Sequence, residues 1–316
     1  MRRWLVAVLL GLCGTSWAQT FPDRPIRLVV GFPPGGGSDA IARVVGPALA
    51  QELRVAVVVD NRAGAGGVIA TEQVARSAPD GYTLQLATAG SYTIAPSLRK
   101  LAYDPARDLE AVALLVKYPN LLVVSATAGI NTVLELVAQA KAQPGKLNFA
   151  SSGAGTIPHL AFEYLNAQSG IQLAHIPYKG NAPAVTDLLA GVVPLMIGDP
   201  GPLLPHVAAG KLKVLGVTSK ARSPLFPQIP SIAEEGIPGY DVSLWLGVTG
   251  PAGMPRDVVA LLSAAIARVM AREDVAARVA ANGMEVAFGG PPVFVRLLED
   301  ERARWADLIR RKKITE

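Results

Sequence analysis

Apolar residues along the chain alternate between short β-branched runs and longer stretches at helical spacing. Residues 26–30 are a continuous apolar run, and residues 40–49 that follow are apolar at a helical period. Residues 55–59 repeat the strand signal and residues 68–76 the helix signal, before a third strand at residues 83–87. Strands that are apolar throughout and separated by helices are typical of a mostly parallel sheet covered on both faces.

The same alternation continues through the rest of the chain. We predict strands at residues 121–125, 146–150, 172–176, 193–197, 213–218 and 242–249, and helices at residues 133–143, 159–168, 186–190, 256–282 and 291–311. A chain of 316 residues usually forms two domains. We therefore expect two α/β lobes: residues 19–121 with 241–316 form lobe I, and residues 122–240 form lobe II, with two crossings that act as a hinge.

The first eighteen residues have the pattern of a signal peptide. Arg2 and Arg3 precede an apolar run at residues 4–12, and small residues stand at the positions that favour cleavage after Ala18. The apolar run is too short for a permanent membrane anchor. We therefore expect an exported, periplasmic protein, and because Cys13 lies in the removed segment, a mature chain without thiols or disulfides.

The charge of the chain does not favour nucleic-acid binding. Removing Arg2 and Arg3 lowers the formal net charge from +5 to 5 − 2 = +3, and aromatic residues make up only 6% of the chain. A nucleic-acid surface needs a concentrated basic face, with stacking aromatics. The basic residues at 310–313 are explained by a solvated helix end, where positive charge complements the terminal carbonyls.

Glycine-rich turns follow several of the predicted strands. Residues 31–39 stand between a strand and a helix, and residues 61–67, 88–91 and 151–156 occupy equivalent places. A single turn of this kind is explained by a tight bend and a helix cap. Because the carboxyl ends of the strands face one crevice in open α/β sheets, four such turns would converge there. Exposed N–H groups at helix starts attract anions, so the repetition favours anion capture.

Two basic side chains lie near these turns. Lys179 either neutralises a carboxylate or is simply solvated. His159 either donates a hydrogen bond to a ligand or satisfies a backbone group at a helix start.

Signatures of catalysis are weak in this chain. The three histidines lack the spacing of a zinc site, and neither a nucleophile elbow nor a phosphate-binding P-loop occurs. Residues 35–40 fit G-x-G-x-x-A, and Asp60 ends the next strand, as in a dinucleotide site. Pro33 and Pro34 between strand and glycines, the export signal and the missing acid/base pair oppose that alternative. We predict no catalytic residue, no cofactor and no metal.

The motifs together resemble the Bug family, the periplasmic solute-binding receptors of tripartite tricarboxylate transporters. The resemblance spans nearly the whole mature chain. It rests on the sequences at residues 21–26, 34–39, 61–67, 79–84, 153–161, 177–180, 205–212 and 245–255.

The resemblance implies a Venus-flytrap fold in which backbone groups and ordered waters hold a ligand's carboxylate between two lobes. The family's contacts carry over to matching positions of this sequence. In lobe I these are Phe32, Pro34, Gly35, Asp39, Ala65, Gly66, Thr88 and Ala89, and in lobe II they are Ser152, Gly155, Thr156, His159, Tyr178 and Asp199.

The implied partners are a small organic carboxylate or amino acid and the membrane permease subunits of the transporter, with the receptor a monomer. Two departures from the family pattern, the Gly- and Pro-rich residues 198–202 and the apolar Ala89, affect the ligand's distal end. A receptor module that signals ligand to a membrane partner is the alternative function, and an exported nucleotide-cofactor enzyme is a second.

Overall fold

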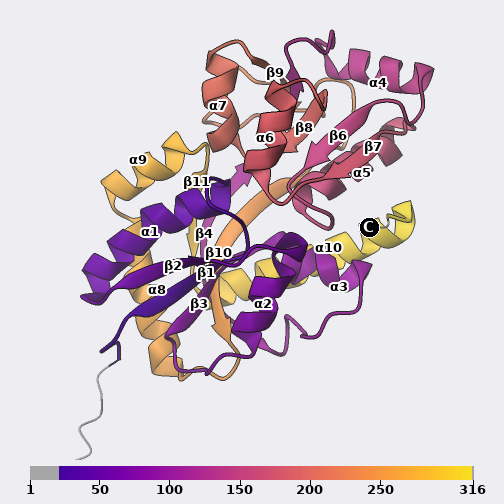
Figure 1. The fold of residues 1–316 in the computed structure, drawn as a ribbon. Helices are drawn as coiled ribbons and strands as arrows, with labels where there is room; N and C mark the ends of the chain where they lie inside the picture. The colour runs from indigo at the N-terminus through magenta and orange to yellow at the C-terminus, as the bar shows by residue number, and fades with distance from the viewer. Residues whose placement is uncertain (1–20, 315–316) are drawn as a thin grey trace, which may run out of the picture.

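The computed structural model describes residues 21–314, which form two α/β lobes (Figure 1). The predicted signal peptide and its cleavage site lie outside the described residues. Lobe I contains strands β1 (Ile26–Val30), β2 (Val57–Asn61), β3 (Thr83–Thr88), β4 (Leu109–Pro119), β10 (Ser243–Pro251) and β11 (Glu285–Gly289). Its helices are α1 (Gly37–Leu53), η1 (Ala65–Gly67), α2 (Val68–Ala75), η2 (Gly90–Ile94), α3 (Ala95–Leu98), α8 (Arg256–Met270), α9 (Glu273–Ala281) and α10 (Pro291–Lys312).

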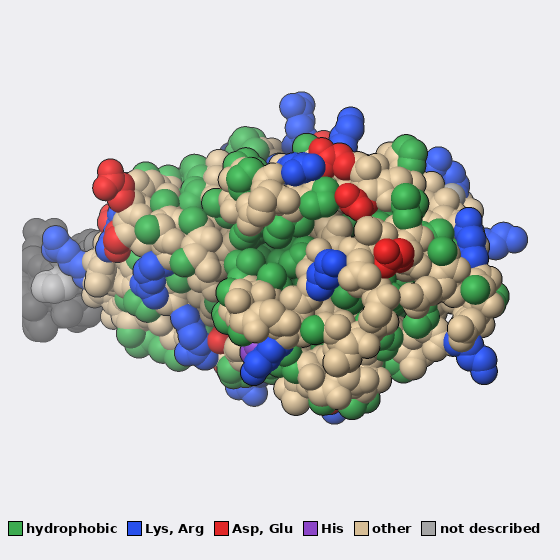
Figure 2. Space-filling view, turned by 90° about the horizontal axis from the view of Figure 1, so that it is seen from above, with side chains coloured by type: hydrophobic (Ala, Val, Ile, Leu, Met, Phe, Trp, Pro, Cys, Tyr) green, Lys and Arg blue, Asp and Glu red, His purple; other side chains and the backbone are tan. Residues whose placement is uncertain are grey.

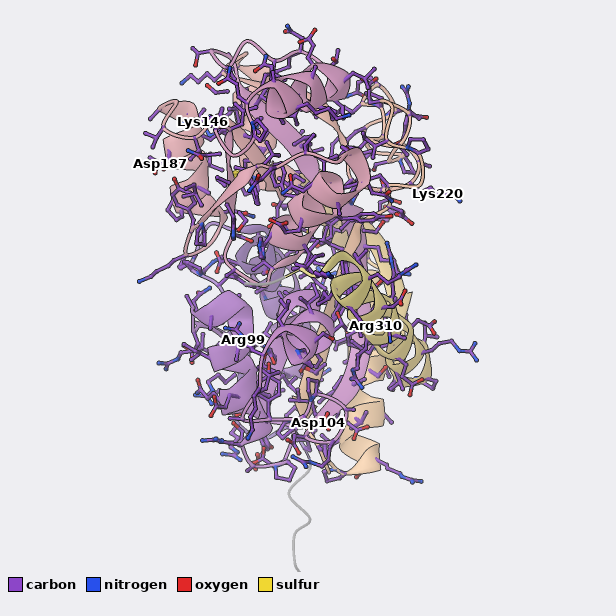
Figure 3. The ribbon with its side chains drawn as sticks, turned by 90° about the vertical axis from the view of Figure 1, so that its right-hand side faces the viewer. Arg99, Asp104, Lys146, Asp187, Lys220 and Arg310 are labelled. Atoms are coloured by element: carbon purple, nitrogen blue, oxygen red, sulfur yellow. The ribbon has the colours of Figure 1, made fainter. Side chains whose placement is uncertain are left out.

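Lobe II is built by the middle of the chain. Its strands are β5 (Leu121–Ser125), β6 (Asn148–Ser151), β7 (Ala174–Pro177), β8 (Leu195–Gly198) and β9 (Leu212–Val217). Its helices are α4 (Val133–Ala142), α5 (Ile157–Ser169), α6 (Asn181–Leu189) and α7 (Pro200–Ala208). Lys146 and Asp187 mark this lobe in Figure 3, and Asp104 and Arg310 mark the other.

Each lobe has one mixed sheet. The order in lobe I is β11-β4-β10-β3-β1-β2, and in lobe II it is β7-β6-β8-β5-β9. Strand β1 runs parallel to β2 and β3, whereas β10 is antiparallel to β3 and β4. In lobe II, β6 is parallel to β7 and β8, and β5 is antiparallel to β8 and β9. The two-lobed α/β fold is confirmed, but with more antiparallel pairing than a mostly parallel sheet has.

The antiparallel pairs belong to the strands that carry the chain between lobes. Strands β4 and β5 are separated by Asn120 alone, and β9 leads back to β10 through residues 218–242. Strand β5 is buried along its whole length, like a strand in the interior of a parallel sheet. A continuous apolar run indicates that a strand is buried on both faces, but it does not indicate the direction in which the strand runs. The sequence pattern therefore does not distinguish a parallel strand from an antiparallel one.

The two crossings are hydrogen-bonded to each other. The Asn120 N–H donates to Thr218 Oγ1 at 2.9 Å, and the Thr218 N–H donates to the Asn120 carbonyl at 3.0 Å. The Val242 N–H then donates to the Thr218 carbonyl at 2.7 Å. Both crossings therefore pass through one small region, which suits a hinge.

Several elements differ from the sequence prediction. The helix predicted at 256–282 is two helices, α8 and α9, because the chain turns at Ala271 and Arg272. Strand β2 begins two residues later than predicted, and β4, β11 and α7 were missed. Helix α7 carries Pro205 internally and Pro200 in its first turn, which makes its sequence look like a loop.

The core is continuous from lobe I into one face of the lobe II sheet. Trp305 of α10 is fully buried, and its Nε1–H donates to Glu301 Oε2 at 2.7 Å. A second apolar cluster fills the other face of the lobe II sheet around Met196 and Leu188. Seen from above, Lys and Arg side chains stand around a face whose hollowed middle is lined by apolar side chains (Figure 2). Within residues 21–314, none of the helices has the length and apolar character needed to cross a membrane.

Candidate functional site

A cavity lies between the two lobes, where the loops after β1, β3, β6 and β8 meet. Its volume is about 50 Å³, and at the ~10–15 Å³ that one water needs it has room for a few water-sized groups. Residues from both lobes form its wall. They are Phe32, Pro33, Pro34, Gly36, Gly37, Ser38, Thr88, Ala89, Gly90, Tyr118, Ser152, Thr156, Ile157, Pro158, Gly180, Asn181, Ala182, Asp199, Leu244 and Trp245.

Three helices begin at this cavity. Helix α1 starts at Gly37, α5 at Ile157 and α6 at Asn181, and residues of each first turn line the wall. The residue before each start makes no side-chain capping hydrogen bond. The first N–H groups of a helix have no partner within the helix, and the aligned peptide dipoles add partial positive charge there. Helix starts of this kind are suited to receive a negative group.

The charge of the wall comes almost entirely from these peptide groups. Among its lining residues there is no lysine, arginine or histidine, and Asp199 is the one carboxylate. Most of the remaining wall is apolar, with Trp245 and Leu244 of β10 and Tyr118 of β4 facing the loops. Such a site is suited to one anionic head group attached to an apolar or weakly polar body.

A wider groove of about 480 Å³ adjoins the cavity. The two share Phe32, Pro33, Ser152 and Gly180. The remaining walls of the groove are Gly31, residues 63–66, Ile69, Arg99, Gly153, Ala154 and residues 177–179. Its cations are Arg99, which lies in lobe I in Figure 3, and the exposed Lys179 of lobe II.

Glycines make the closest contacts between the lobes. A Cβ atom added to Gly66 would lie 3.0 Å from the Ala154 carbonyl oxygen, and one added to Gly180 would lie 2.9 Å from Cδ of Pro33. Real Cβ atoms essentially never approach to less than 3.0 Å, so a side chain at Gly180 would force a shift, and one at Gly66 would press on the Ala154 carbonyl oxygen. The lobes of the described structure therefore meet as in a closed form, with glycine backbone on one side of each contact.

Asp39 supports the turn before α1 from behind. Its Oδ2 accepts from the Gly35 N–H at 3.1 Å and from Arg43 Nε at 2.9 Å, and its Oδ1 accepts from Asn61 Nδ2 at 3.0 Å. Burial acts to raise the pKa of Asp39, but the hydrogen bonds from Arg43, Gly35 and Asn61 outweigh it and hold the pKa below its usual value. The Asp39 carboxylate is therefore ionised, and its hydrogen-bond partners all belong to lobe I.

His159 and His175 support the corresponding turn before α5. Their rings stack with centroids 4.0 Å apart, and Phe149 stacks on His175 at 4.8 Å. The Gly155 N–H donates to His159 Nδ1 at 3.2 Å, and Ser151 Oγ lies 2.6 Å from His175 Nε2. Burial lowers the pKa of His159 to about 4, and burial together with the neighbouring His159 ring lowers that of His175 to about 3. Both rings are neutral at ordinary pH.

Asp199, at the start of α7, collects hydrogen bonds from both lobes. The Gly37 N–H of α1 donates to its Oδ2 at 3.1 Å, and Asn181 Nδ2 donates to the same oxygen at 2.5 Å. Asn120 Nδ2, in the hinge, donates to Oδ1 at 3.0 Å. Burial raises the pKa of Asp199, and the hydrogen bonds from Asn120, Gly37, Tyr118 and Asn181 oppose that rise.

The structure brings most of the predicted ligand contacts together. Phe32, Pro34, Thr88, Ala89, Ser152, Thr156 and Asp199 line the cavity. Ala65, Gly66 and Tyr178 line the groove beside it, together with Phe32 and Ser152. Gly35, Asp39, Gly155 and His159 line neither and lie in or behind the turns.

The predicted ligand contacts omit wall residues that stand outside the glycine-rich turns. Tyr118 and Trp245 come from strands of lobe I, and Asn181 comes from the first turn of α6. Asn181 follows the predicted loop residues 177–180, so the turn preceding a helix was the one signal that could have included it. Within residues 21–314, His, Asp and Glu side chains do not gather in groups of three that could hold a metal ion.

Comparisons with known proteins agree with this geometry. A family model described as "Tripartite tricarboxylate transporter family receptor" matches residues 41–314. Protein BugT of Bordetella pertussis (strain Tohama I) is 37% identical over 305 residues, which cover 95% of this chain and 93% of BugT. The predicted resemblance to the Bug family is confirmed.

Two solved structures are similar over nearly the whole described chain. "R. palustris Rpa4515 with adipate" has a TM-score of 0.90 at 33% identity and covers 93% of this chain and 99% of that chain. "MatC (Rpa3494) from Rhodopseudomonas palustris with bound malate" has a TM-score of 0.86 at 32% identity and covers 92% of this chain and 100% of that chain.

Proposed function

This chain belongs to the tripartite tricarboxylate transporter receptor family, and from that membership we propose that it captures a small organic carboxylate between its lobes. The carrying observation is the convergence of three helix starts, of which those of α5 and α6 have no side-chain cap, on one cavity that has no lysine or arginine in its wall. The similar proteins with adipate and malate support the same chemical class.

The carboxylate binds at the starts of α5 and α6 in this proposal. Their N–H groups replace the water around the anion, and bridging waters complete the contacts. The Gly37 N–H at α1 is already used by Asp199. The proposed ligand contacts are the predicted residues that line the cavity or the groove, except Asp199, whose oxygens accept hydrogen bonds from the protein itself. Gly35, Asp39, Gly155 and His159 act by shaping the turns.

The ligand's body lies against the apolar wall formed by Phe32, Trp245 and Leu244. One anchored carboxylate fits this wall better than three, because a tricarboxylate needs more positive partners than the cavity offers. The exposed Lys179 in the groove is positioned to attract an anion as it approaches.

Family membership also supports the cellular role. We propose that the chain works in the periplasm after cleavage behind Ala18, as a monomer that delivers its ligand to the permease subunits of a tripartite transporter. Residues 19–121 with 241–316 and residues 122–240 are the two lobes that close on the ligand. No catalytic step is part of this proposal.

Calorimetry on protein that has been unfolded, stripped of ligand and refolded tests the proposal. The panel contains mono-, di- and tricarboxylates and amino acids, and neutral sugars serve as the control. We expect saturable binding of at least one carboxylate and none of the sugars. Binding of a sugar while every carboxylate fails would overturn the anion anchor.

A further inference from the structure

Asp199 is a buried carboxylate whose hydrogen-bonding capacity is filled by the protein itself. Gly37, Asn181 and Asn120 donate to its two oxygens, and Tyr118 contributes a fourth hydrogen bond. An ionised carboxylate has about four acceptor sites. A ligand therefore finds none of them available, although Asp199 lies in the wall of the cavity.

The donors around Asp199 are arranged for a negative charge. Asn120 and Asn181 both direct their amide nitrogens at the carboxylate, and the amide oxygens of both are buried without a partner among the described residues. Leaving buried acceptors unsatisfied costs free energy, so this orientation is stabilised by the charge it faces. No cation takes part in these bonds, which leaves the start of α1 as the positive partner.

The same carboxylate joins lobe I, lobe II and the crossing between them. Gly37 belongs to lobe I, Asn181 and Asp199 belong to lobe II, and Asn120 is the crossing between β4 and β5. The hydrogen bond from Gly37 to Asp199 connects the two lobes in the closed arrangement, because its two ends lie in different lobes. Its donor and acceptor both belong to the protein.

We propose that Asp199 is a positioning residue that holds the cleft closed before a ligand arrives, by placing the protein's own carboxylate at the start of α1. Opening the cleft then breaks a hydrogen bond between the Gly37 N–H and a charged acceptor. The carboxylate occupies the anion site of one helix, and the starts of α5 and α6 stay available. The consequence for ligand affinity rests on the function proposed above, whereas the closure itself does not.

Distances between spin labels in the ligand-free protein test the closure directly. The described chain contains no cysteine, so labels can be attached at Val58→Cys in lobe I and Val192→Cys in lobe II, whose side chains are 52% and 64% exposed. We expect one short distance in the parent protein and a longer, broader distribution after Asp199→Ala. Identical distributions in the two proteins would overturn the proposal.

Gly37→Ala breaks the same contact from the other lobe and covers the case in which Asp199→Ala does not fold. A Cβ atom at Gly37 would lie 2.6 Å from Asp199 Oδ2, so the closed contact cannot form unchanged. The matched control for the distance measurement is Gly36→Ala, because nothing lies within 4 Å of a Cβ atom at that position. Opening in Gly37→Ala together with closure in Gly36→Ala supports the proposal, and equal behaviour of the two contradicts it.

Ligand binding separates positioning from direct contact. If Asp199 acts on closure alone, Asp199→Ala lowers the affinity for every ligand by the same factor, roughly 10- to 100-fold, because each ligand must shift the same equilibrium. Glu234→Ala is the control, since this carboxylate bonds to Ser231 and Arg222 within lobe II. If the loss of affinity in Asp199→Ala differs widely between ligands, Asp199 contacts the ligand directly and the proposal is wrong. If the parent protein binds no carboxylate, the proposed function is wrong. The distances between the spin labels then still test the closure.

Discussion

The turn before α1 in lobe I and the turn before α5 in lobe II both lead from a buried strand into a helix without a side-chain cap. They are held in different ways. In lobe I the ionised Asp39 gathers Gly35, Arg43 and Asn61, whereas in lobe II neutral hydroxyl and imidazole groups hold the loop. The two helix starts also have different acceptors, because an N–H group of α1 donates to the carboxylate of Asp199 and those of α5 do not.

This difference shows what a glycine-rich turn does and does not specify. The turn presents N–H groups, and the fold decides which acceptor meets them. In lobe I that acceptor is supplied by a residue 162 positions away in the chain. The two turns therefore share their chemistry but not their partner, and three experiments can break or sharpen this comparison.

The largest effect is expected where the turn before α5 meets the loop after β2 of lobe I. Gly66→Leu places a side chain where a Cβ atom would already lie 3.0 Å from the Ala154 carbonyl oxygen. The lobes cannot then close, and we expect affinity for the ligand to fall by about a thousandfold, or ~4 kcal/mol, in calorimetry. Gly170→Leu is the control, because Gly170 has nearly the same φ (+63° against +64°) but nothing within 4 Å. If both variants lose the same affinity for the ligand, backbone strain and not the contact between the lobes is the cause.

The second effect is a pH dependence confined to the lobe II turn. Unfolded His159 takes up a proton near its usual pKa of 6.5, whereas burial keeps it neutral in the folded protein until about pH 4. The unfolded state binds more protons in this window, so the free energy of unfolding falls as pH falls, by about 3 kcal/mol for His159. Urea denaturation between pH 7 and pH 4 measures this slope. We expect His159→Gln to reduce it.

A histidine outside the stack provides the control for that slope. His206 lies in α7, apart from the stack of Phe149, His159 and His175. A slope that survives in His159→Gln but disappears in His206→Gln would show that the stack is not its source.

The smallest effect compares the residues that hold the two turns. Asp39→Asn removes a charged acceptor from three donors, and we expect the free energy of unfolding at pH 7 to fall by about 2 kcal/mol. Thr156→Val removes two neutral bonds, from Thr156 Oγ1 to the Gly153 carbonyl at 2.7 Å and from Ser152 Oγ to Thr156 Oγ1 at 3.3 Å. Because the second bond is long, the loss should cost about 1 kcal/mol. Equal costs in urea denaturation would mean that charge adds nothing to the lobe I turn.

The acid behaviour of Asp39 sharpens the same comparison. Its pKa in the folded protein lies below the usual 3.8, so its contribution is present above that value and is lost as pH falls through the lower folded pKa. The lobe I turn therefore weakens only below about pH 4, whereas the lobe II turn is already destabilised on the way there.

The sequence predicted the parts of this molecule that follow from local patterning. Strands β1, β3 and β5 and helices α2, α4 and α10 lie within a residue of their predicted bounds, since apolar periodicity and flanking turns define them. Strand β4 was missed although residues 109–119 are largely apolar, a stretch that Glu110 and Lys117 interrupt.

The candidate site was predictable where the residues stand in turns, and less so elsewhere. Thr88 ends β3, and Ser152 and Thr156 stand in the turn after β6, so chain position placed them at the crevice. Trp245 and Tyr118 reach the cavity because β10 and β4 cross between lobes, which is a property of the tertiary fold. No local sequence pattern predicts the hydrogen bond between Gly37 and Asp199, which are 162 positions apart in the chain.

The absence of lysine and arginine from the cavity wall has a consequence for the medium in which this receptor works. Attraction between mobile surface charges fades as ionic strength rises, because dissolved ions screen it over roughly 8–10 Å. Peptide dipoles fixed inside a closed cleft act at contact distance, with no room for counterions. Once bound, the ligand should therefore dissociate equally slowly at low and at high salt concentration.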